Sequence, residues 1–421
     1  MRTHRGRGPR TPHEREAVKE TKFVFGAGLV AGASDNDPTT VATLAVVGST
    51  TTYALGWLTL LVIPMLAVIQ SIAAQVGAVS KKGLEDCVRA QYGRGWAFVA
   101  LLALLVVNLL TLAADLEGGG AALGMLTHVH YLWWLVPLGA LTVLMLVFGN
   151  YRSVERVLRY VPLLFLTYVG AAFLAHPDWR AVLAGSFAPH FSFQKDMVSG
   201  ALALLGTTLT AYAYVWETIE QSEEKPRLAR LGLVQVDAAL GIVVAGLTFW
   251  FILIATGATL GVHHRHVQTA EEAAQALAPV AGKYAALVFG IGLLGSALIA
   301  IPVIAGTSAY VAAEMFGWRR SLDETFDHAR AFYLTLTACV AVAVLIGFAG
   351  VRPITLLFFS GIAGGIATPL TMALMLLIGR NRKVMHQRRI SIPLAVAGWC
   401  VTAVVGAATL TYLVQTLTGK G

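Results

Sequence analysis

Charged side chains are scarce in this sequence, and their scarcity excludes most soluble architectures. Asp, Glu, Lys and Arg make up 13% of the 421 residues, whereas hydrophobic residues make up 57%. The mean hydropathy is +0.69, and apolar runs repeatedly reach the roughly 18 residues that a membrane helix needs. We therefore expect an all-α polytopic membrane protein that has no water-soluble domain between its spans.

Cysteine is rare, and the motifs of common enzymes are absent. The three cysteines, Cys87, Cys339 and Cys400, have no motif spacing, which argues against a disulfide or a zinc site. No His-Glu-x-x-His, Gly-x-Ser-x-Gly or Gly-x-x-x-x-Gly-Lys-Ser/Thr motif is present. We therefore expect neither an enzyme nor a cofactor, and any transport must use ion gradients or the membrane potential.

The long apolar runs predict about eleven membrane-spanning helices. Residues 1–21 are polar and rich in Arg and Pro, so we expect a disordered cytoplasmic tail there, followed by a single transmembrane domain over 22–421. The predicted spans are roughly 22–50, 54–79, 95–126, 132–149, 156–175, 198–220, 232–260, 280–316, 331–350, 353–379 and 390–417.

Basic residues are distributed unevenly among the predicted loops. A net charge of +8 would suggest nucleic acid as a partner of a soluble protein, but here the distribution indicates topology. With the amino terminus in the cytoplasm, all but six of the 31 Lys and Arg residues fall on the cytoplasmic side. An odd number of spans then places the carboxyl terminus outside, and no nucleic-acid partner is predicted. The exceptions on the outer side are Arg180, Lys195, Arg265, Lys283, Arg352 and Lys420.

The stretch "GASDNDPTT", residues 32–40, interrupts the first apolar run with two acids and a proline. An ionised residue at the bilayer centre costs about 2.5–3.5 kcal/mol on insertion scales, so Asp35 and Asp37 need a compensating partner. Pro38 lacks a backbone donor, and Asp, Asn and Gly favour turns over helix. The helix should therefore be broken near mid-membrane, as in transporters that bind their substrate there. A solvated kink near the membrane surface is the alternative.

A second interruption is expected about five helices later if the chain consists of two inverted repeats. The sixth span, "GALALLGTTLTAYAYVWETIEQSEEK", has a hydroxyl-rich patch that contains Gly206, Thr207, Thr208 and Thr210. Gly and Thr are also common packing residues in membrane helices, so this patch alone is weak evidence. Its pairing with the first interruption predicts a binding site between two broken helices.

These segments resemble the Nramp family of divalent-metal transporters. The similarity is carried by "AGASDNDPTTVATLAVV", by "AADLEGGGAALGML" in the third span and by "GTTLTAYAYVWETIEQ", and it extends over most of the chain. It implies a leucine-transporter-like fold with two inverted five-helix repeats, at about 22–175 and 198–379, and an extra helix at about 390–417. It also implies an integral protein of the bacterial inner membrane.

Several site positions depart from the family pattern, including Thr39 and Thr40, which replace the family's glycine and asparagine. The family's Asp-Pro-Gly-Asn falls on residues 37–40 and its Met-Pro-His on 210–212, so Thr210 replaces the methionine and Tyr212 the histidine. A thioether favours transition metals, whereas carboxylates, hydroxyls, carbonyls and water suit Mg²⁺ or Mn²⁺. The pattern is similar to an Nramp-related branch linked to Mg²⁺ and Mn²⁺. Loss of the histidine argues against strong proton coupling.

Six residues are candidate metal ligands. The resemblance gives Asp37 the family's aspartate position, whereas Asp35 is an added charge that should raise cation occupancy. Thr210 and Thr40 are expected to set selectivity. Glu117 follows Asp115 in the third span, and packing at a helix interface is its alternative role. The full set is Asp37, Asp35, Thr40, Thr210, Thr207 and Glu117.

The sequence therefore predicts a secondary transporter or facilitator that imports Mg²⁺ and/or Mn²⁺ with weak or no proton coupling. A proton-coupled Mn²⁺/Fe²⁺ symporter and an amino-acid/cation transporter of the same fold remain alternatives. Asp35 and Asp37 argue against the latter because they would repel a substrate carboxylate. The outer "HHRH", residues 263–266, could collect metal, but exposed loop polarity explains it equally well. A divalent ion and the bilayer are the predicted partners, and the oligomeric state stays open.

Overall fold

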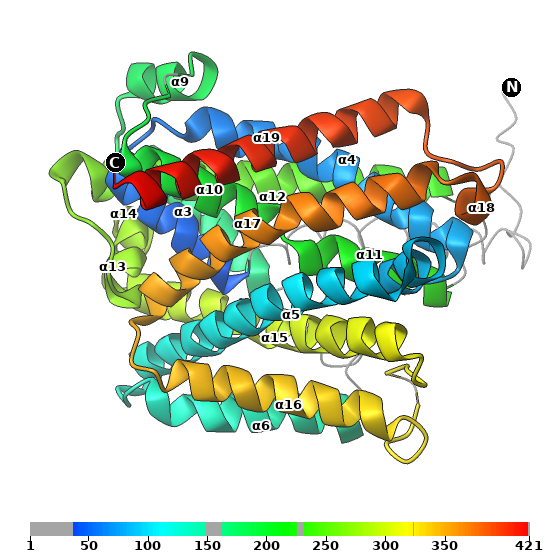
Figure 1. The fold of residues 1–421 in the computed structure, drawn as a ribbon. Coiled ribbons are helices and arrows are strands. Elements are labelled where there is room, and N and C mark those ends of the chain that lie inside the picture. Colours follow the sequence, from blue (N-terminus) through cyan, green and yellow to red (C-terminus); the bar gives the residue numbers. More distant parts are fainter. Residues whose placement is uncertain (1–36, 149–160, 190, 225–230, 323, 420–421) are drawn as a thin grey trace, which may run out of the picture.

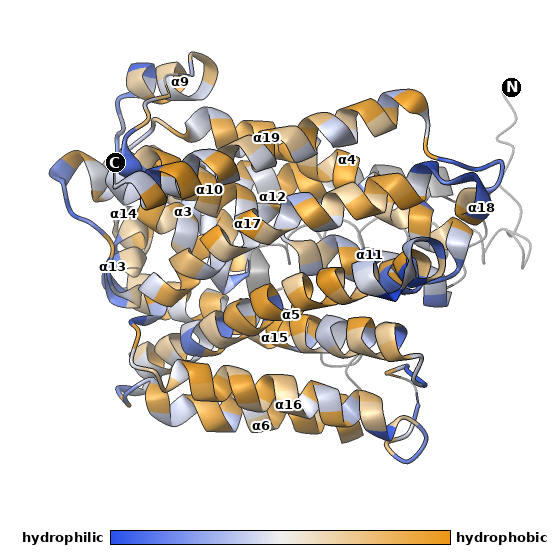
Figure 2. Cartoon of the chain, viewed as in Figure 1, coloured by the Kyte–Doolittle hydropathy of each residue, from blue (hydrophilic) through white to orange (hydrophobic). Residues whose placement is uncertain are grey.

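The structure is a computed structural model that describes residues 37–148, 161–189, 191–224, 231–322 and 324–419. Every regular element in these ranges is a helix. The long helices lie side by side in one bundle, and the loops and short helices gather at its two ends (Figure 1). Hydrophobic residues predominate along the bundle and hydrophilic ones at its ends (Figure 2). The predicted all-α polytopic architecture is confirmed.

The chain order of the helices follows the predicted spans closely. The first half contains α3 (Pro38–Thr51), α4 (Gly56–Ser80), α5 (Leu84–Thr127), α6 (Leu132–Phe148), η1 (Val161–Leu166), α8 (Thr167–Leu174), α9 (Trp179–Phe187), α10 (Lys195–Thr208) and α11 (Ala211–Glu224). The second half contains α12 (Leu231–Thr259), η3 (Gly261–His263), α13 (Ala270–Ala274), η4 (Gln275–Leu277), α14 (Ala278–Ala281), η5 (Gly282–Tyr284), α15 (Ala285–Phe316), α16 (Arg330–Gly347), α17 (Pro353–Arg380), α18 (Arg382–Met385) and α19 (Ile392–Thr418).

Eight helical stretches in the described part of the chain are long and apolar enough to cross a membrane. The remaining three predicted spans correspond to shorter helices, which are α3 for the first span, α6 for the fourth and η1 with α8 for the fifth. Each predicted span is thus helical where the structure describes it. The predicted tail, residues 1–21, and the start of the first span lie outside the described residues.

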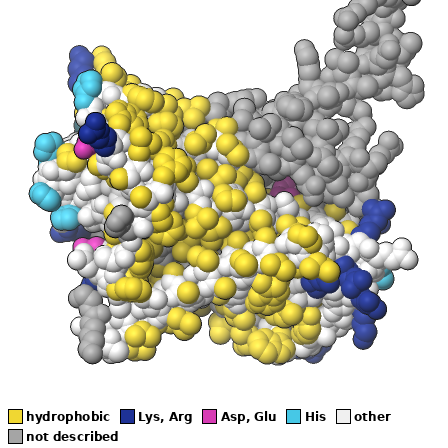
Figure 3. All heavy atoms as spheres, turned by 90° about the horizontal axis from the view of Figure 1, so that it is seen from above, with side chains coloured by type: hydrophobic (Ala, Val, Ile, Leu, Met, Phe, Trp, Pro, Cys, Tyr) yellow, Lys and Arg dark blue, Asp and Glu magenta, His cyan; other side chains and the backbone are white. Residues whose placement is uncertain are grey.

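The outer surface of the bundle matches a lipid environment. In the face shown in Figure 3, hydrophobic side chains form a broad belt, and Lys, Arg and His lie toward the two ends. Large apolar side chains on several helices are more than half exposed, among them Trp133, Leu144, Leu345 and Val396. Large apolar side chains on the outside of a helix bundle are stable when lipid, rather than water, contacts them.

The first interruption is the point at which α3 begins. Asp37 is the N-cap residue of α3, and its side-chain oxygen accepts a hydrogen bond from the backbone N–H of Thr40 at 2.6 Å. Pro38 occupies the first helical turn, where a missing N–H costs nothing because that group has no partner within the helix. The sequence "DPTT" is therefore a helix start in the middle of an apolar region.

The second interruption separates α10 from α11. Helix α10 ends at Thr208 and α11 begins at Ala211, with Leu209 and Thr210 between them. Thr368 of α17 donates a hydrogen bond to the carbonyl oxygen of Leu209 at 3.2 Å. This bond satisfies a carbonyl that the break releases, as a low-dielectric surrounding requires. The predicted break in the sixth span is confirmed.

Small residues hold the broken helices close to their neighbours. A Cβ atom on Gly206 of α10 would overlap with the carbonyl oxygen of Gly361 and the backbone nitrogen of Gly365, both on α17. A Cβ atom on Gly118 of α5 would lie 2.9 Å from Cβ of Pro38. Close backbone approach of this kind is typical of membrane helix interfaces. It places the start of α3 and the α10–α11 break between α5 and α17.

Candidate functional site

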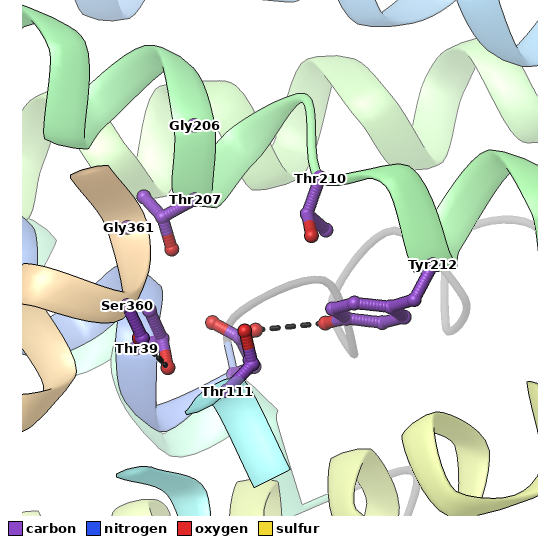
Figure 4. A pocket seen from close by; sticks show the side chains of 9 residues that line it. Thr39, Thr111, Gly206, Thr207, Thr210, Tyr212, Ser360 and Gly361 are labelled. Atoms are coloured by element: carbon purple, nitrogen blue, oxygen red, sulfur yellow. Dashed lines mark hydrogen bonds between the residues drawn. The ribbon is translucent and has the colours of Figure 1, made fainter. Parts of the chain in front are cut away.

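A narrow cavity lies where the start of α3 faces the break between α10 and α11. Its walls come from the start of α3, from α5, from the α10–α11 break and from α17, and the side chains point toward one another (Figure 4). Every polar side-chain atom that lines it is an oxygen, and none of the lining residues carries positive charge. The lining residues are Asp37, Thr39, Thr111, Gly206, Thr207, Thr210, Tyr212, Ser360 and Gly361.

Asp37 is the acid that lines this cavity, and its side chain is 3% exposed. Its Oδ1 accepts a hydrogen bond from the backbone N–H of Thr40, and its Oδ2 accepts one from the Tyr212 hydroxyl at 2.8 Å. As the N-cap of α3, the carboxylate also faces the positive end of the helix dipole. Both interactions stabilise negative charge on Asp37, whereas burial opposes it, so a cation in the cavity would compensate this charge.

Asp115 is a second buried acid, which lies behind the cavity wall on α5. Thr39 donates its hydroxyl proton to Asp115 Oδ1 at 2.8 Å, whereas Oδ2 has no hydrogen-bond partner among the described residues. Ser360 Oγ lies 3.5 Å from the same Thr39 hydroxyl. No Lys or Arg of the described residues pairs with Asp37 or Asp115. A cation in the cavity would compensate these buried charges.

Threonine hydroxyls connect the start of α3 with the end of α10. The hydroxyls of Thr40 on α3 and Thr207 on α10 lie 3.0 Å apart and share a hydrogen bond. Thr207 and Thr210 line the cavity. Thr40 is not part of the lining, but its backbone N–H donates a hydrogen bond to Asp37. Short hydroxyl side chains leave space beside the carboxylate and offer hard oxygen ligands. The structure therefore brings together four of the predicted ligands.

The other two predicted ligands are placed differently. Glu117 is fully buried, and within the described part of the chain neither of its carboxylate oxygens has a hydrogen-bond partner. It packs toward α16, because a Cβ atom on Gly347 would lie 3.6 Å from Glu117 Oε1 and 2.9 Å from Leu135 of α6. It does not belong to the lining of the described cavity. Asp35 lies outside the described residues.

Thr111 and Ser360 line the cavity but were not identified from the sequence. Thr111 precedes Asp115 by four residues on α5, and this helical spacing puts both side chains on one face. From that spacing, Thr111 could have been predicted to lie near Asp115. Ser360 belongs to α17, and only the close packing of α17 against α10 and α3 brings it to the cavity. No local pattern would have found it.

The outer histidines do not assemble into a metal site in the part of the chain that the structure describes. Within those residues, no group of three or more His, Cys, Asp or Glu side chains is arranged to hold a metal ion. His263, His264 and His266 are exposed beside η3. Exposed loop polarity accounts for them.

Comparisons with known proteins identify the family to which this chain belongs. A family model described as natural resistance-associated macrophage protein-like, Nramp, matches residues 28–415. The chain belongs to this family. A divalent metal cation transporter, MntH, of Deinococcus radiodurans is 27% identical over 400 residues, which cover 90% of this chain and 87% of that one. The MntH of Verminephrobacter eiseniae is 26% identical and covers 93% and 89% of the two chains.

Several solved structures of other transporters have the same fold as this chain. A manganese transporter of Eremococcus coleocola superposes with a TM-score of 0.70 at 18% identity, over 97% of this chain and 88% of that one. MhsT, solved with L-phenylalanine, gives a TM-score of 0.62 at 14% identity and covers 92% and 98%. Mhp1, a nucleobase-cation-symport-1 family transporter, gives 0.53 at 16% identity and covers 93% and 90%. The chain is thus an integral membrane transporter of leucine-transporter-like fold, and not an enzyme.

Proposed function

We propose that this protein imports a divalent cation, Mg²⁺ and/or Mn²⁺, through the cavity beside Asp37. The observation that carries the proposal is the all-oxygen lining of that cavity. The names of the relatives support the divalent ion, since they are divalent metal cation transporters and, among the structures, a manganese transporter.

The ligand chemistry favours a hard ion. Carboxylate and hydroxyl oxygens suit Mg²⁺ and Mn²⁺, whereas sulfur selects softer metals. Thr210 puts a hydroxyl at the break between α10 and α11, and Thr207, Thr39 and Ser360 add three more around Asp37. With so few charged ligands, the ion would keep part of its water shell, which Mg²⁺ does readily.

The negative charge at the cavity suits a divalent cation better than an amino-acid substrate. Asp37 already occupies the amino-terminal end of α3, where a transporter of this fold could otherwise hold a substrate carboxylate. Asp115 adds a second carboxylate behind Thr39. Together the two acids match the two positive charges of one metal ion and would repel an anionic group.

Uptake of a divalent ion needs no coupled proton to be favourable. One charge that moves across the membrane gains about 2.3 kcal/mol per 100 mV, so a divalent ion gains about 4.6 kcal/mol with the inside negative. The cavity lining contains no imidazole, the side chain that titrates most readily near neutral pH. We therefore expect a facilitator or a weakly coupled transporter in the bacterial inner membrane.

Reconstituted vesicles test this function directly. Uptake of Mg²⁺, Mn²⁺ and Ca²⁺ would be followed with internal indicator dyes, with and without an imposed membrane potential, alongside an internal pH dye. We expect Mg²⁺ to enter or to inhibit Mn²⁺ entry, and the internal pH to stay constant during metal entry. If millimolar Mg²⁺ neither enters nor inhibits, and Mn²⁺ entry acidifies the vesicles, the protein is a proton-coupled Mn²⁺/Fe²⁺ symporter instead.

A further inference from the structure

Tyr212 holds the cavity acid in a way that the proposed transport does not explain. It lies in the first turn of α11, directly after the break, and is 8% exposed. Its hydroxyl donates a hydrogen bond to Asp37 Oδ2 at 2.8 Å across the cavity (Figure 4). The other oxygen of Asp37 accepts from the backbone N–H of Thr40 at 2.6 Å. Both carboxylate oxygens therefore have a donor in this state.

The two donors differ in how easily they can leave. The Thr40 N–H is a backbone group in the first turn of α3, and its loss would uncap that helix. The Tyr212 hydroxyl belongs to a side chain from a separate segment, 175 residues away in the sequence. A cation that approaches Asp37 competes with both donors for the same negative charge, and the side-chain donor is the one that can rotate away.

We propose that the Tyr212 hydroxyl competes with the transported ion for Asp37. This competition sets the minimum charge that an ion needs in order to bind. This inference rests on the proposed function. An ion binds when its attraction to Asp37 exceeds the Tyr212–Asp37 hydrogen bond. At equal distance a divalent ion is attracted about twice as strongly as a monovalent one. Tyr212 thereby excludes Na⁺ and K⁺ more effectively than Mg²⁺ or Mn²⁺.

Displacement of Tyr212 also connects ion binding with movement of α11. Helix α11 packs against α4 and α15, and the Tyr212–Asp37 hydrogen bond joins its first turn to the start of α3. When an ion takes the place of the hydroxyl, this connection between the two broken helices is released. Ion occupancy would then loosen the start of α11.

The test compares Tyr212→Phe with Tyr214→Phe in vesicles. Tyr214 lies two residues further along α11, is fully buried and hydrogen-bonds to Thr371 of α17, so its variant loses a tyrosine hydroxyl from the same helix without touching Asp37. Hydrogen bonds to charged groups are strong enough that we expect a roughly threefold to thirtyfold lower apparent KM for Mn²⁺ in Tyr212→Phe. We also expect Na⁺ to inhibit Mn²⁺ uptake in this variant, whereas wild type and Tyr214→Phe resist Na⁺.

An unchanged or raised KM in Tyr212→Phe would overturn the inference, because Tyr212 would then orient Asp37 rather than compete for it. Hydrogen exchange on the wild-type protein gives a second measurement that needs no variant. Mn²⁺ should lower the protection of amides at the start of α11, and higher protection there would contradict the proposal. Lack of any divalent uptake by wild type would instead refute the proposed function, and the inference with it.

Discussion

At the scale of single residues, Asp37 has two roles that substitution can separate. It caps α3 and supplies the anion of the cavity. Asn caps helices about as well as Asp, but it carries no charge. Asp37→Asn should therefore keep the unfolding temperature in detergent within a few degrees of wild type and abolish metal uptake. Asp37→Ala should lose uptake as well, together with about 1 kcal/mol of stability from the missing cap.

Asp178 offers a matched control for the Asp37 variants. It caps α9 at the end of the bundle, where its carboxylate accepts from the N–H groups of Arg180 and Ala181. Asp178→Asn changes the same chemical group at the same helix position and should leave uptake unchanged. Full uptake by Asp37→Asn would show that the carboxylate is not a ligand.

Thr210 is the residue at which metal preference should be adjustable. Thr210→Met places a thioether at the α10–α11 break, and sulfur favours softer ions. We expect Cd²⁺ to inhibit Mn²⁺ uptake roughly tenfold more strongly than in wild type, and Mg²⁺ to inhibit less. Thr411→Met, on α19 and outside the cavity lining, is the control. An unchanged ratio of Cd²⁺ to Mg²⁺ inhibition would remove Thr210 from the selectivity site.

At the scale of helices, contact between α10 and α17 shapes the cavity. Gly206 allows the two backbones to approach so closely that any Cβ atom would overlap with Gly361 and Gly365. Gly206→Ala should therefore push the helices apart and cost on the order of 1–3 kcal/mol, as overpacking in a dense interior does. The measurement is thermal unfolding of the variant in detergent, followed by metal uptake by the fraction of the variant that folds.

The control for this substitution is another helical glycine with space around it. At Gly406 on α19, the nearest atom to an added Cβ is the Cβ of Pro369 at 4.0 Å, an ordinary contact. Gly406→Ala should keep both stability and uptake. Equal behaviour of the two variants would mean that α10 and α17 can separate without cost, and that the close packing does not hold the cavity.

At the scale of the whole molecule, the two ends of the bundle differ in charge. The carboxyl end of α19 and the helices α9, α13 and α14 lie at one end, and α18 lies at the other (Figure 1). The loop around α18 is rich in basic residues, a composition typical of cytoplasmic loops. They are Arg380, Arg382, Lys383, Arg388 and Arg389.

This asymmetry predicts that the carboxyl terminus faces outside. In a background with Cys400→Ala, which removes the exposed native thiol, Thr418→Cys should react with a membrane-impermeant maleimide on intact cells. Lys383→Cys should react only after the cells are opened, and it serves as the control at the other end. The reverse labelling pattern would invert the topology and assign the basic end to the outside.

The sequence by itself determined the membrane character, the order of the helices, the helix start at Asp37 and the break in the sixth span. These are local properties: the length of an apolar run, a proline after a capping acid, and a cluster of small hydroxyl residues all act within a few neighbours. Asp37, Thr207 and Thr210 could be predicted at the cavity because each lies at a break in its own helix. Their surroundings could not be predicted in the same way.

The tertiary structure decided which other side chains reach the cavity. Asp115 and Glu117 are two residues apart on α5, so they point roughly 200° apart around a helix with 3.6 residues per turn. The packing of α5 turns Asp115 toward Thr39 and Glu117 toward Gly347 of α16. The sequence predicts this angle, but it does not predict which helix packs against each side of α5. Ser360 likewise depends on how α17 packs, because burial beside a distant segment is set by the whole bundle.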